Sequence, residues 1–268
     1  MNLKQTLPAT ILIVFLMVII TSSFSSQRQK KEQEIAQKAE QVRRDAEEKL
    51  YLMGKFDPAQ RADFILVPEQ YTIFDVNDMY LRRETFEAFL VMQSAAERDG
   101  IELRITSATR NFDSQQKLWN ERWSQVTVVE KQNINTNNPD DFSVFKKILE
   151  YVAVPGTSRH HWGTDVDLNG ANLPYFTTET GIREYMWLVK NAGTFGFCQT
   201  YRAREFDKRT GYNEEKWHWS YLPLAGIFTQ DYKRLIKNED INGFLGDEYV
   251  LGQDLVNQYA LNINPECI

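Results

Sequence analysis

The sequence predicts an α+β fold, in which a small, mostly antiparallel sheet is flanked by helices. Residues 101–106 (IELRIT) alternate strictly between apolar and polar side chains, as a half-buried strand does. Residues 84–99 place Phe86, Phe89 and Ala96 on one broad apolar face, which is typical of an amphipathic helix. The 268 residues, of which 42% are hydrophobic, are enough for one large domain with appendages.

Further elements follow along the chain, and most of them are short. Asp113 is expected to cap a helix that carries Gln115. The polar, Asn-rich residues 125–141 are expected to form a surface loop. Trp217 and Trp219 are expected to lie in the core. The remaining predicted elements are strands at 165–168, 195–201 and 217–222, helices at 142–152, 184–192, 228–237 and 249–259, and a charged turn at 202–211.

The first 26 residues differ from the rest of the chain. Residues 7–20 (LPATILIVFLMVII) are almost wholly apolar and are followed by small polar residues. A run of about 14 residues fits the core of a signal peptide, whereas a spanning helix needs about 20 residues. We therefore expect residues 1–26 to be a signal peptide or a membrane anchor, with the choice left open. Either segment would export the rest of the chain.

Residues 27–53 predict a charged helical stalk. They are rich in Gln, Glu, Lys and Ala and contain neither Gly nor Pro. Their apolar residues form one narrow stripe at helical spacing: Ile35, Ala39, Val42 and Ala46. Such a stripe favours a solvated spacer over a short coiled coil. Residues 54–268 are then expected to form the main domain.

Charge and cysteine content narrow the possible partners and the compartment. The formal net charge is −6 and the basic residues are scattered, so nothing points to a nucleic-acid partner. Cys198 and Cys267 are the only cysteines. In an oxidising compartment we expect them to be paired, and two separate buried thiols are the alternative.

The three histidines of the chain all fall in two stretches, 158–167 and 215–218. His160, Asp167 and His218 offer two imidazoles and a carboxylate as metal ligands. A catalytic zinc site uses three such ligands and keeps one position open, whereas a structural site is usually closed and rich in Cys. Neither cysteine lies near these stretches. Glu215, three residues before His218, is a candidate general base. The pattern therefore predicts one catalytic zinc ion.

These stretches also resemble a known family. The motifs Ser158-x-His160-x-x-Gly163-x-x-x-Asp167 and Glu215-x-x-His218-Trp219 look like the two zinc motifs of the VanY-type D-alanyl-D-alanine carboxypeptidases. That family belongs to the zinc peptidases that share a site with lysostaphin and the hedgehog fold. A third motif, Ser107-x-x-Arg110-x-x-x-x-Gln115, resembles the family's substrate-binding segment. The three motifs come in the family's order, and the likeness spans roughly residues 55 to 235.

Two positions leave the ligand set ambiguous. Asp165 stands where many relatives have a small apolar residue. It is a rival to Asp167, because residues two apart on a strand share one side. His161 is a similar rival to the neighbouring His160. Both alternatives stay open on the sequence alone.

The resemblance implies the same architecture and a zinc-dependent D-alanyl-D-alanine carboxypeptidase that trims peptidoglycan stem peptides. Arg110 would stabilise the developing oxyanion. Ser107, Gln115 and Ser158 would help to hold the terminal carboxylate or the neighbouring backbone of the substrate. The alternatives are an L,D-carboxypeptidase or a peptidoglycan endopeptidase on the same scaffold, or a non-catalytic wall-binding module, for which Glu215 would have no use. The catalytic part is expected in the periplasm or on the outer face of the cytoplasmic membrane, and the oligomeric state is left open.

Overall fold

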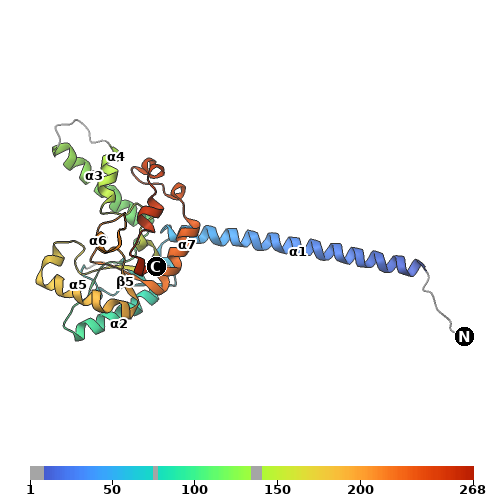
Figure 1. Ribbon diagram of the computed structural model, residues 1–268, viewed down its shortest axis with the longest axis horizontal. Helices are drawn as coiled ribbons and strands as arrows, with labels where there is room; N and C mark the ends of the chain where they lie inside the picture. Colours follow the sequence, from blue (N-terminus) through green and yellow to red (C-terminus); the bar gives the residue numbers. More distant parts are fainter. Residues whose placement is uncertain (1–8, 75–77, 134–140) are drawn as a thin grey trace. The chain divides into compact units, whose positions relative to one another are not determined.

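The computed structural model describes residues 9–74, 78–133 and 141–268, with side chains from residue 27 onward apart from 126–133, 141 and 207. The chain divides into two compact units, Met1–Glu48 and Lys49–Ile268, which are described separately. Figure 1 shows the elements in chain order.

The first unit consists of most of helix α1 (Ala9–Leu52). Ile35 and Val42 of the apolar stripe are 60% and 62% exposed within it, and Arg43 forms ion pairs with Glu40 and Glu47 one turn away on either side. The helix predicted at 27–53 is therefore present as far as Leu52. Among the described residues, no helix combines the length and the apolar character needed to cross a membrane. The side chains of residues 1–26 lie outside the described residues, so the signal peptide or anchor stays a prediction.

The second unit contains two small antiparallel sheets, which confirms the mixed helix-and-sheet prediction. The larger sheet has four strands in the order β3-β4-β6-β5, and all neighbouring strands in it are antiparallel. Its strands are β3 (Ile105–Ser107), β4 (Asp165–Leu168), β5 (Phe197–Gln199) and β6 (His218–Tyr221). The smaller sheet pairs β1 (Phe64–Leu66) with β2 (Tyr80–Arg82).

One face of the larger sheet packs against an apolar core. Val166 and Leu168 of β4 and Trp219 of β6 are buried there in one core cluster with residues of helices α2 (Arg83–Arg98) and α5 (Glu179–Asn191). Because side chains alternate across a strand, the polar residues of β4 and β6 point to the opposite face. That opposite face carries Asp165, Asp167, His218 and Ser220.

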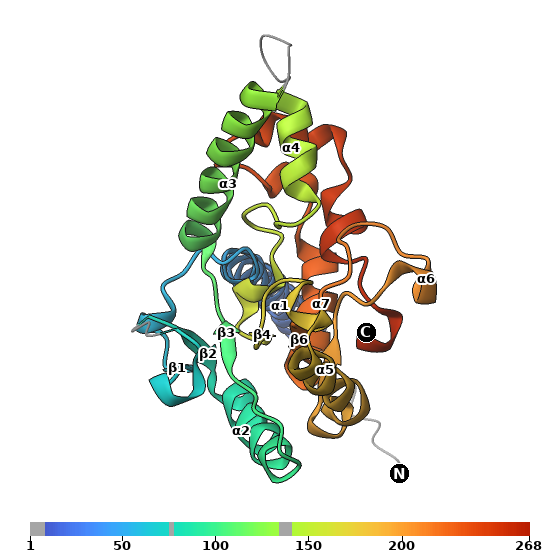
Figure 2. The same cartoon turned by 90° about the vertical axis from the view of Figure 1, so that its left-hand side faces the viewer.

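A second core cluster holds the remaining helices together. Trp119, Trp162 and Tyr232 are fully buried in it. It joins helices α3 (Phe112–Asn133), α4 (Asp141–Leu149) and α7 (Leu222–Leu235) with the C-terminal segment. Helices α3 and α4 lie side by side in both views (Figures 1 and 2).

The two cysteines form a disulfide. Cys198 on β5 is bonded to Cys267 in the last turn of the chain, with their Cα atoms 5.6 Å apart. The predicted pairing is confirmed, and it fastens the C-terminal segment to the edge strand of the larger sheet.

The strand predicted at 101–106 is shorter than expected. Strand β3 begins only at Ile105, although the apolar residues before it are buried. The Asn169 side chain accepts a hydrogen bond from the Arg104 N–H and donates one to the Glu102 carbonyl oxygen. A side chain therefore satisfies backbone groups that a neighbouring strand would otherwise bond.

Several helices begin or end elsewhere than predicted. Helix α3 begins at Phe112, because the Asn111 side chain, and not Asp113, accepts a hydrogen bond from the N–H of Ser114. The same helix continues to residue 133, so the first half of the predicted loop at 125–141 is helical; residues 134–140 lie outside the described residues. Helix α5 begins at Glu179, where the Thr178 side chain caps it.

The region after β5 also differs from the prediction. The predicted turn at 202–211 contains a short helix, α6 (Arg204–Asp207). Helix α7 begins at Leu222, six residues early, since Pro223 is compatible with a first helical turn. The predicted helix at 249–259 is instead a 3₁₀-helix at Asp247–Gly252 and a single π-helical turn at Val256–Ala260. Gly252 lies inside the predicted range, and glycine disfavours a helix interior by about 1 kcal/mol.

Candidate metal centre

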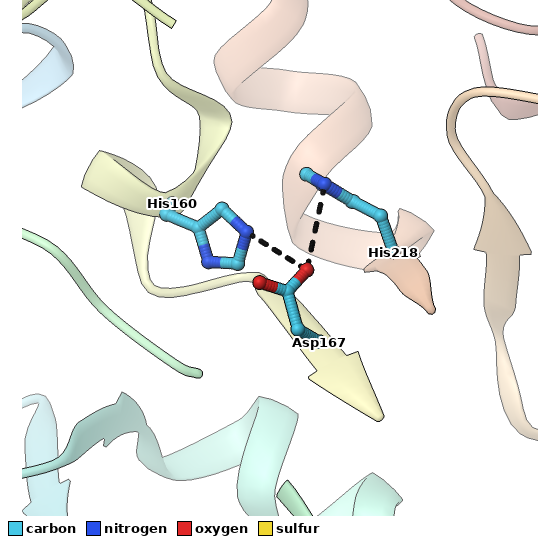
Figure 3. Close-up of side chains that lie close together, drawn as sticks. All are labelled: His160, Asp167 and His218. Atoms are coloured by element: carbon cyan, nitrogen blue, oxygen red, sulfur yellow. Dashed lines mark ion pairs between the residues drawn. The ribbon is translucent and has the colours of Figure 1, made fainter. Parts of the chain in front are cut away.

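Three predicted ligands meet on the polar face of the larger sheet. Asp167 on β4 stands opposite His218 on β6 in the strand register. His160 reaches them from a buried 3₁₀-helix, Arg159–Trp162, that precedes β4. Figure 3 shows both imidazoles pointing at the carboxylate, with 3.3 Å between His160 Nε2 and Asp167 Oδ1 and 3.7 Å between His218 Nδ1 and the same oxygen. Among the described residues, these three offer donor atoms within 4.8 Å of one another that could hold a metal ion.

The local fold explains how His160 comes to lie next to Asp167. Its 3₁₀-helix ends at Gly163, whose φ of 71° lies in the left-handed region that favours glycine. A Cβ atom there would come within 2.5 Å of the Phe64 ring. The turn can therefore pack closely against β1 and send the chain directly into β4, which carries Asp167.

The donor atoms of this group fit a cation. Nδ1 of His160 donates to the Ala108 carbonyl oxygen at 2.7 Å, which leaves the lone pair of Nε2 facing Asp167. Within the described residues, His160 Nε2 and Asp167 Oδ1 are both buried without a hydrogen-bond partner. Buried polar atoms without a partner are uncommon in folded proteins, and a bound cation would satisfy both of these atoms.

The electrostatics of the group agree with this assignment. Burial would raise the pKa of the Asp167 carboxyl, but the neighbouring His160 and His218 hold it below its ordinary value. Burial lowers the pKa of His160, and the charge of Arg110 lowers it further. These directions favour an ionised carboxylate and a neutral His160 imidazole, which are the forms that bind a metal.

The imidazole of His218 lies between two carboxylates. Burial alone would lower its pKa, but the hydrogen bonds to Asp165 and Glu215 raise it to about 9. The two carboxylates lie on opposite sides of the ring: Asp165 Oδ2 is 2.9 Å from Nε2, and Glu215 Oε2 is 2.9 Å from Nδ1. The negative potential that attracts a proton here also attracts a metal cation.

Neither rival ligand belongs to the group of donor atoms that could hold the ion. Asp165 is fully buried behind it, where its carboxylate contacts Nε2 of His218 and the guanidinium of Arg159. His161 turns the other way: its Nδ1 donates to the Arg110 carbonyl oxygen, and its Nε2 accepts from the N–H of Gly156. Both ring nitrogens of His161 form hydrogen bonds with the backbone. The structure therefore brings His160, and not His161, to Asp167.

Glu215 lies beside the group in the connection between β5 and β6. Its backbone N–H donates to the Tyr201 carbonyl oxygen at 2.8 Å, and its own carbonyl accepts from the Gln199 side chain at 3.2 Å. These bonds to the end of β5 fix the backbone of Glu215. Its carboxylate is 16% exposed and faces the same cavity as the three candidate ligands.

Arg110 approaches from the other side of the cavity. Its Nη1 donates to Ser107 Oγ at 2.7 Å and lies 3.6 Å from Asp167 Oδ2, and its Nε donates to Gln115 Oε1 at 2.9 Å. Gln115 is fully buried, and its amide nitrogen donates to the Ala153 carbonyl oxygen. The predicted residues Ser107 and Gln115 therefore hold the guanidinium in place. Gln115 and Ser158 both line the cavity.

The cavity has a volume of about 170 Å³. Beyond the predicted residues, its lining includes four aromatic side chains that sequence reasoning did not assign to a site: Tyr151, Tyr201, Tyr212 and Trp217. Trp217 was expected in the core with Trp219. Trp219 is buried there, whereas Trp217, one residue before β6, is only partly buried and lines the cavity, although its carbonyl oxygen accepts a hydrogen bond from the N–H of Leu168. A larger groove of about 980 Å³ continues from the cavity past Trp217 and Tyr151.

A model of the VanY D-alanyl-D-alanine carboxypeptidase family matches residues 78–224, which is more than half of the chain. The chain belongs to the VanY family. The matched segment begins before β2 and ends in the first turn of α7. It therefore includes all four strands of the larger sheet and every residue that the sequence predicted for the site.

Relatives within and around the VanY family are distant. A D-alanyl-D-alanine carboxypeptidase of Enterococcus faecalis is 27% identical over 148 residues, which are 55% of this chain and 50% of that protein. This chain spans about half the length of that relative and of another from Bacillus subtilis.

Two solved structures also align with this chain. A variant of the vancomycin resistance D,D-pentapeptidase VanY in complex with Zn(II) is 24% identical, with a TM-score of 0.45 over 66% of this chain and 93% of that one. The LdcB LD-carboxypeptidase is 23% identical, with a TM-score of 0.48 over 69% of this chain and 81% of that one.

Proposed function

We propose that this protein is a zinc-dependent D-alanyl-D-alanine carboxypeptidase that trims peptidoglycan stem peptides. One observation carries the proposal. Two imidazoles and a carboxylate converge, and His160 Nε2 and Asp167 Oδ1 are buried there without a hydrogen-bond partner. The three side chains share one cavity with a second carboxylate and a guanidinium. Membership of the VanY family supports the same reaction.

One zinc ion would be held by His160, Asp167 and His218. This is a donor set of two imidazoles and one carboxylate, which catalytic zinc sites use while they keep one position open. When bound, zinc supplies Lewis acidity to a carbonyl oxygen and lowers the pKa of water to about 7. All other parts of the mechanism belong to the side chains around the cavity.

Glu215 is proposed as the general base. Its carboxylate lies 2.9 Å from the imidazole of a proposed ligand, so it stands beside the place where water attacks. It would take a proton from that water and later give it to the amine of the departing D-alanine. General acid–base groups contribute about 10²–10⁴-fold to such reactions.

Arg110 is proposed to stabilise the negative charge that develops on the scissile carbonyl oxygen. Its guanidinium is 26% exposed, which leaves it reachable from the cavity although two of its nitrogens bond Ser107 and Gln115. These two residues would act on the substrate through Arg110. Ser158, at the cavity wall, would add an uncharged donor to the carboxylate of the substrate.

The proposed substrate also gives a location. Peptidoglycan is assembled outside the cytoplasmic membrane, so the domain at 54–268 would act in the periplasm or on the outer face of that membrane. The disulfide between Cys198 and Cys267 fits such an oxidising compartment. Export by residues 1–26 is part of this proposal.

The test is to incubate the zinc-loaded protein with defined tri-, tetra- and pentapeptide stems and to identify the products by mass. We expect loss of the terminal D-alanine from the pentapeptide, and a strong loss of turnover when its C-terminus is amidated, because a carboxypeptidase must recognise a free carboxylate. Cleavage of the tetrapeptide alone would identify an L,D-carboxypeptidase. Equal cleavage of amidated and free peptides would identify an endopeptidase, and no cleavage at all a wall-binding module.

A further inference from the structure

Directly behind the proposed ligands lies a second polar layer on the same two strands. Asp165 of β4 stands opposite Ser220 of β6, two residues along the ladder from the pair of Asp167 and His218 and on the same face of the sheet. Both Asp165 and Ser220 are completely buried, and neither lines the cavity. This layer therefore cannot contact a substrate.

The carboxylate of Asp165 is saturated with donors. Oδ1 accepts from the hydroxyls of Thr164 at 2.7 Å and Ser220 at 2.8 Å. Oδ2 accepts from Arg159 Nε at 3.1 Å and lies 2.9 Å from His218 Nε2. These four donors hold the carboxylate of Asp165 in a single orientation. In that orientation Oδ2 faces Nε2 of His218.

Arg159 ties this carboxylate to the rest of the domain. Its side chain is fully buried, and its other two nitrogens donate to Thr229 of α7 and to Ser220, each at 3.0 Å. The guanidinium also lies over the Trp162 ring, 4.5 Å from its centroid. A buried ion pair gains little net stability over an apolar replacement, because desolvation opposes the Coulomb attraction. Stability alone therefore does not account for its placement against His218.

The two proposed imidazole ligands are held by different acceptors. In His160, Nδ1 is the ring nitrogen that faces away from Asp167, and it donates to the neutral backbone carbonyl of Ala108. In His218 the corresponding nitrogen is Nε2, and it faces the carboxylate of Asp165 instead. A carboxylate in this position fixes the tautomer and the ring orientation of a metal-binding imidazole and makes the ring a stronger donor.

We propose that Asp165, anchored by Arg159, is a positioning residue for the metal site. Its carboxylate accepts the hydrogen of His218 Nε2, so that a metal ion can replace the hydrogen between Nδ1 and Glu215 and bind the lone pair of Nδ1 beside Asp167. The inference rests on the proposed metal site and deepens it. It also gives a role to the aspartate at the position where the sequence departs from its family's pattern.

The experiment compares Asp165→Asn with wild-type protein. The amide keeps the shape of the side chain and removes its charge. Zinc affinity is measured by competition with a chromophoric chelator, and the ligand field by the visible absorption of the Co²⁺-substituted protein. We expect zinc to bind about 10–100-fold more weakly, with a shifted Co²⁺ spectrum and an unchanged metal stoichiometry at saturation. Ser220→Ala is the matched control, because it removes another hydrogen bond of the same carboxylate but not the one to His218.

A second measurement does not depend on whether a variant folds. With three histidines in the chain, nitrogen-15 correlation spectra of the zinc-loaded wild type can assign the tautomer of each ring. Hydrogen on Nε2 of His218 is expected, and hydrogen on Nδ1 would overturn the inference. Unchanged zinc affinity and Co²⁺ spectrum in Asp165→Asn would also overturn it while leaving the proposed function intact. Wild-type protein that takes up no zinc would overturn both.

Discussion

Two adjacent layers of the ladder between β4 and β6 contain similar residues in opposite states. In the front layer, Asp167 and His218 line the cavity, and one carboxylate oxygen has no hydrogen-bond partner. In the rear layer, Asp165 and Ser220 are sealed from the cavity, and both carboxylate oxygens accept hydrogen bonds. The two aspartates differ by two positions in the sequence and share one face of one strand.

The difference between the layers shows that neighbours, and not residue type, assign the roles. An unpartnered buried oxygen has free capacity for a ligand, whereas a saturated one can only support what it already contacts. A change in the front layer should therefore appear in metal content and turnover. A change in the rear layer should appear first in stability and in the fine tuning of the metal site.

The largest expected effect belongs to Asp167→Ala. The substitution removes one of three proposed ligands and leaves two imidazoles beside Arg110. Zinc measured by mass spectrometry should fall close to zero, and peptide turnover should fall to background. His161→Ala is the control for losing a neighbouring buried side chain and should retain its zinc. An Asp167→Ala protein with its full zinc content would show that the ligand set is wrong.

Glu215→Gln should separate chemistry from metal binding within the front layer. The amide cannot take a proton, so kcat should fall by about 10²–10⁴-fold, while the zinc content stays at the wild-type level. Glu214→Gln is the matched control. Its carboxylate lies 3.4 Å from the Tyr185 hydroxyl, away from the proposed ligands, and its turnover should stay within about threefold of wild type. A Glu215→Gln enzyme that is equally active would exclude the proposed base.

Much of the front layer could be predicted from sequence because its residues are chemically distinctive. With three histidines in the whole chain, few ligand sets were possible. The sequence could not choose between Asp165 and Asp167, since alternation puts both on the same face of the strand. That choice depends on Arg159 and Thr229, which fill the space behind Asp165 from a 3₁₀-helix and from α7.

The fold was predictable to a similar degree. The amphipathic helix at 84–99 and the strand at 165–168 carry strong periodic patterns, and both are present. The strand at 101–106 also carries a strong pattern but is largely irregular, because the Asn169 side chain replaces its neighbour in the ladder. Whether these residues form a strand depends on contacts with a residue more than sixty positions away. The periodicity of the local sequence gives no information about such contacts.

Gln115→Ala tests the support of Arg110 at the edge of the front layer. Without the Gln115 oxygen, the guanidinium loses one of its two hydrogen bonds to side chains. Misplacing a catalytic group by about 1 Å can cost up to about 100-fold, so kcat/KM should fall by no more than that, with unchanged zinc. Gln116→Ala, on the next position of the same helix, should behave like wild type. Loss of zinc in Gln115→Ala would mean that the residue supports the ligands instead.

The smallest effect on turnover is expected from the rear layer, in Ser220→Ala. The Ser220 hydroxyl donates to Asp165 Oδ1 and accepts from Arg159 Nη2. Its removal leaves a buried guanidinium nitrogen without that acceptor, which should lower the free energy of unfolding by about 1–3 kcal/mol, measured by urea denaturation of the zinc-loaded protein. Thr164 still donates to Oδ1, and Oδ2 still faces His218, so zinc affinity and kcat should stay within about threefold of wild type. If Ser220→Ala lost zinc as completely as Asp167→Ala, the two layers would form a single unit. The separation between binding in front and support behind would then be wrong.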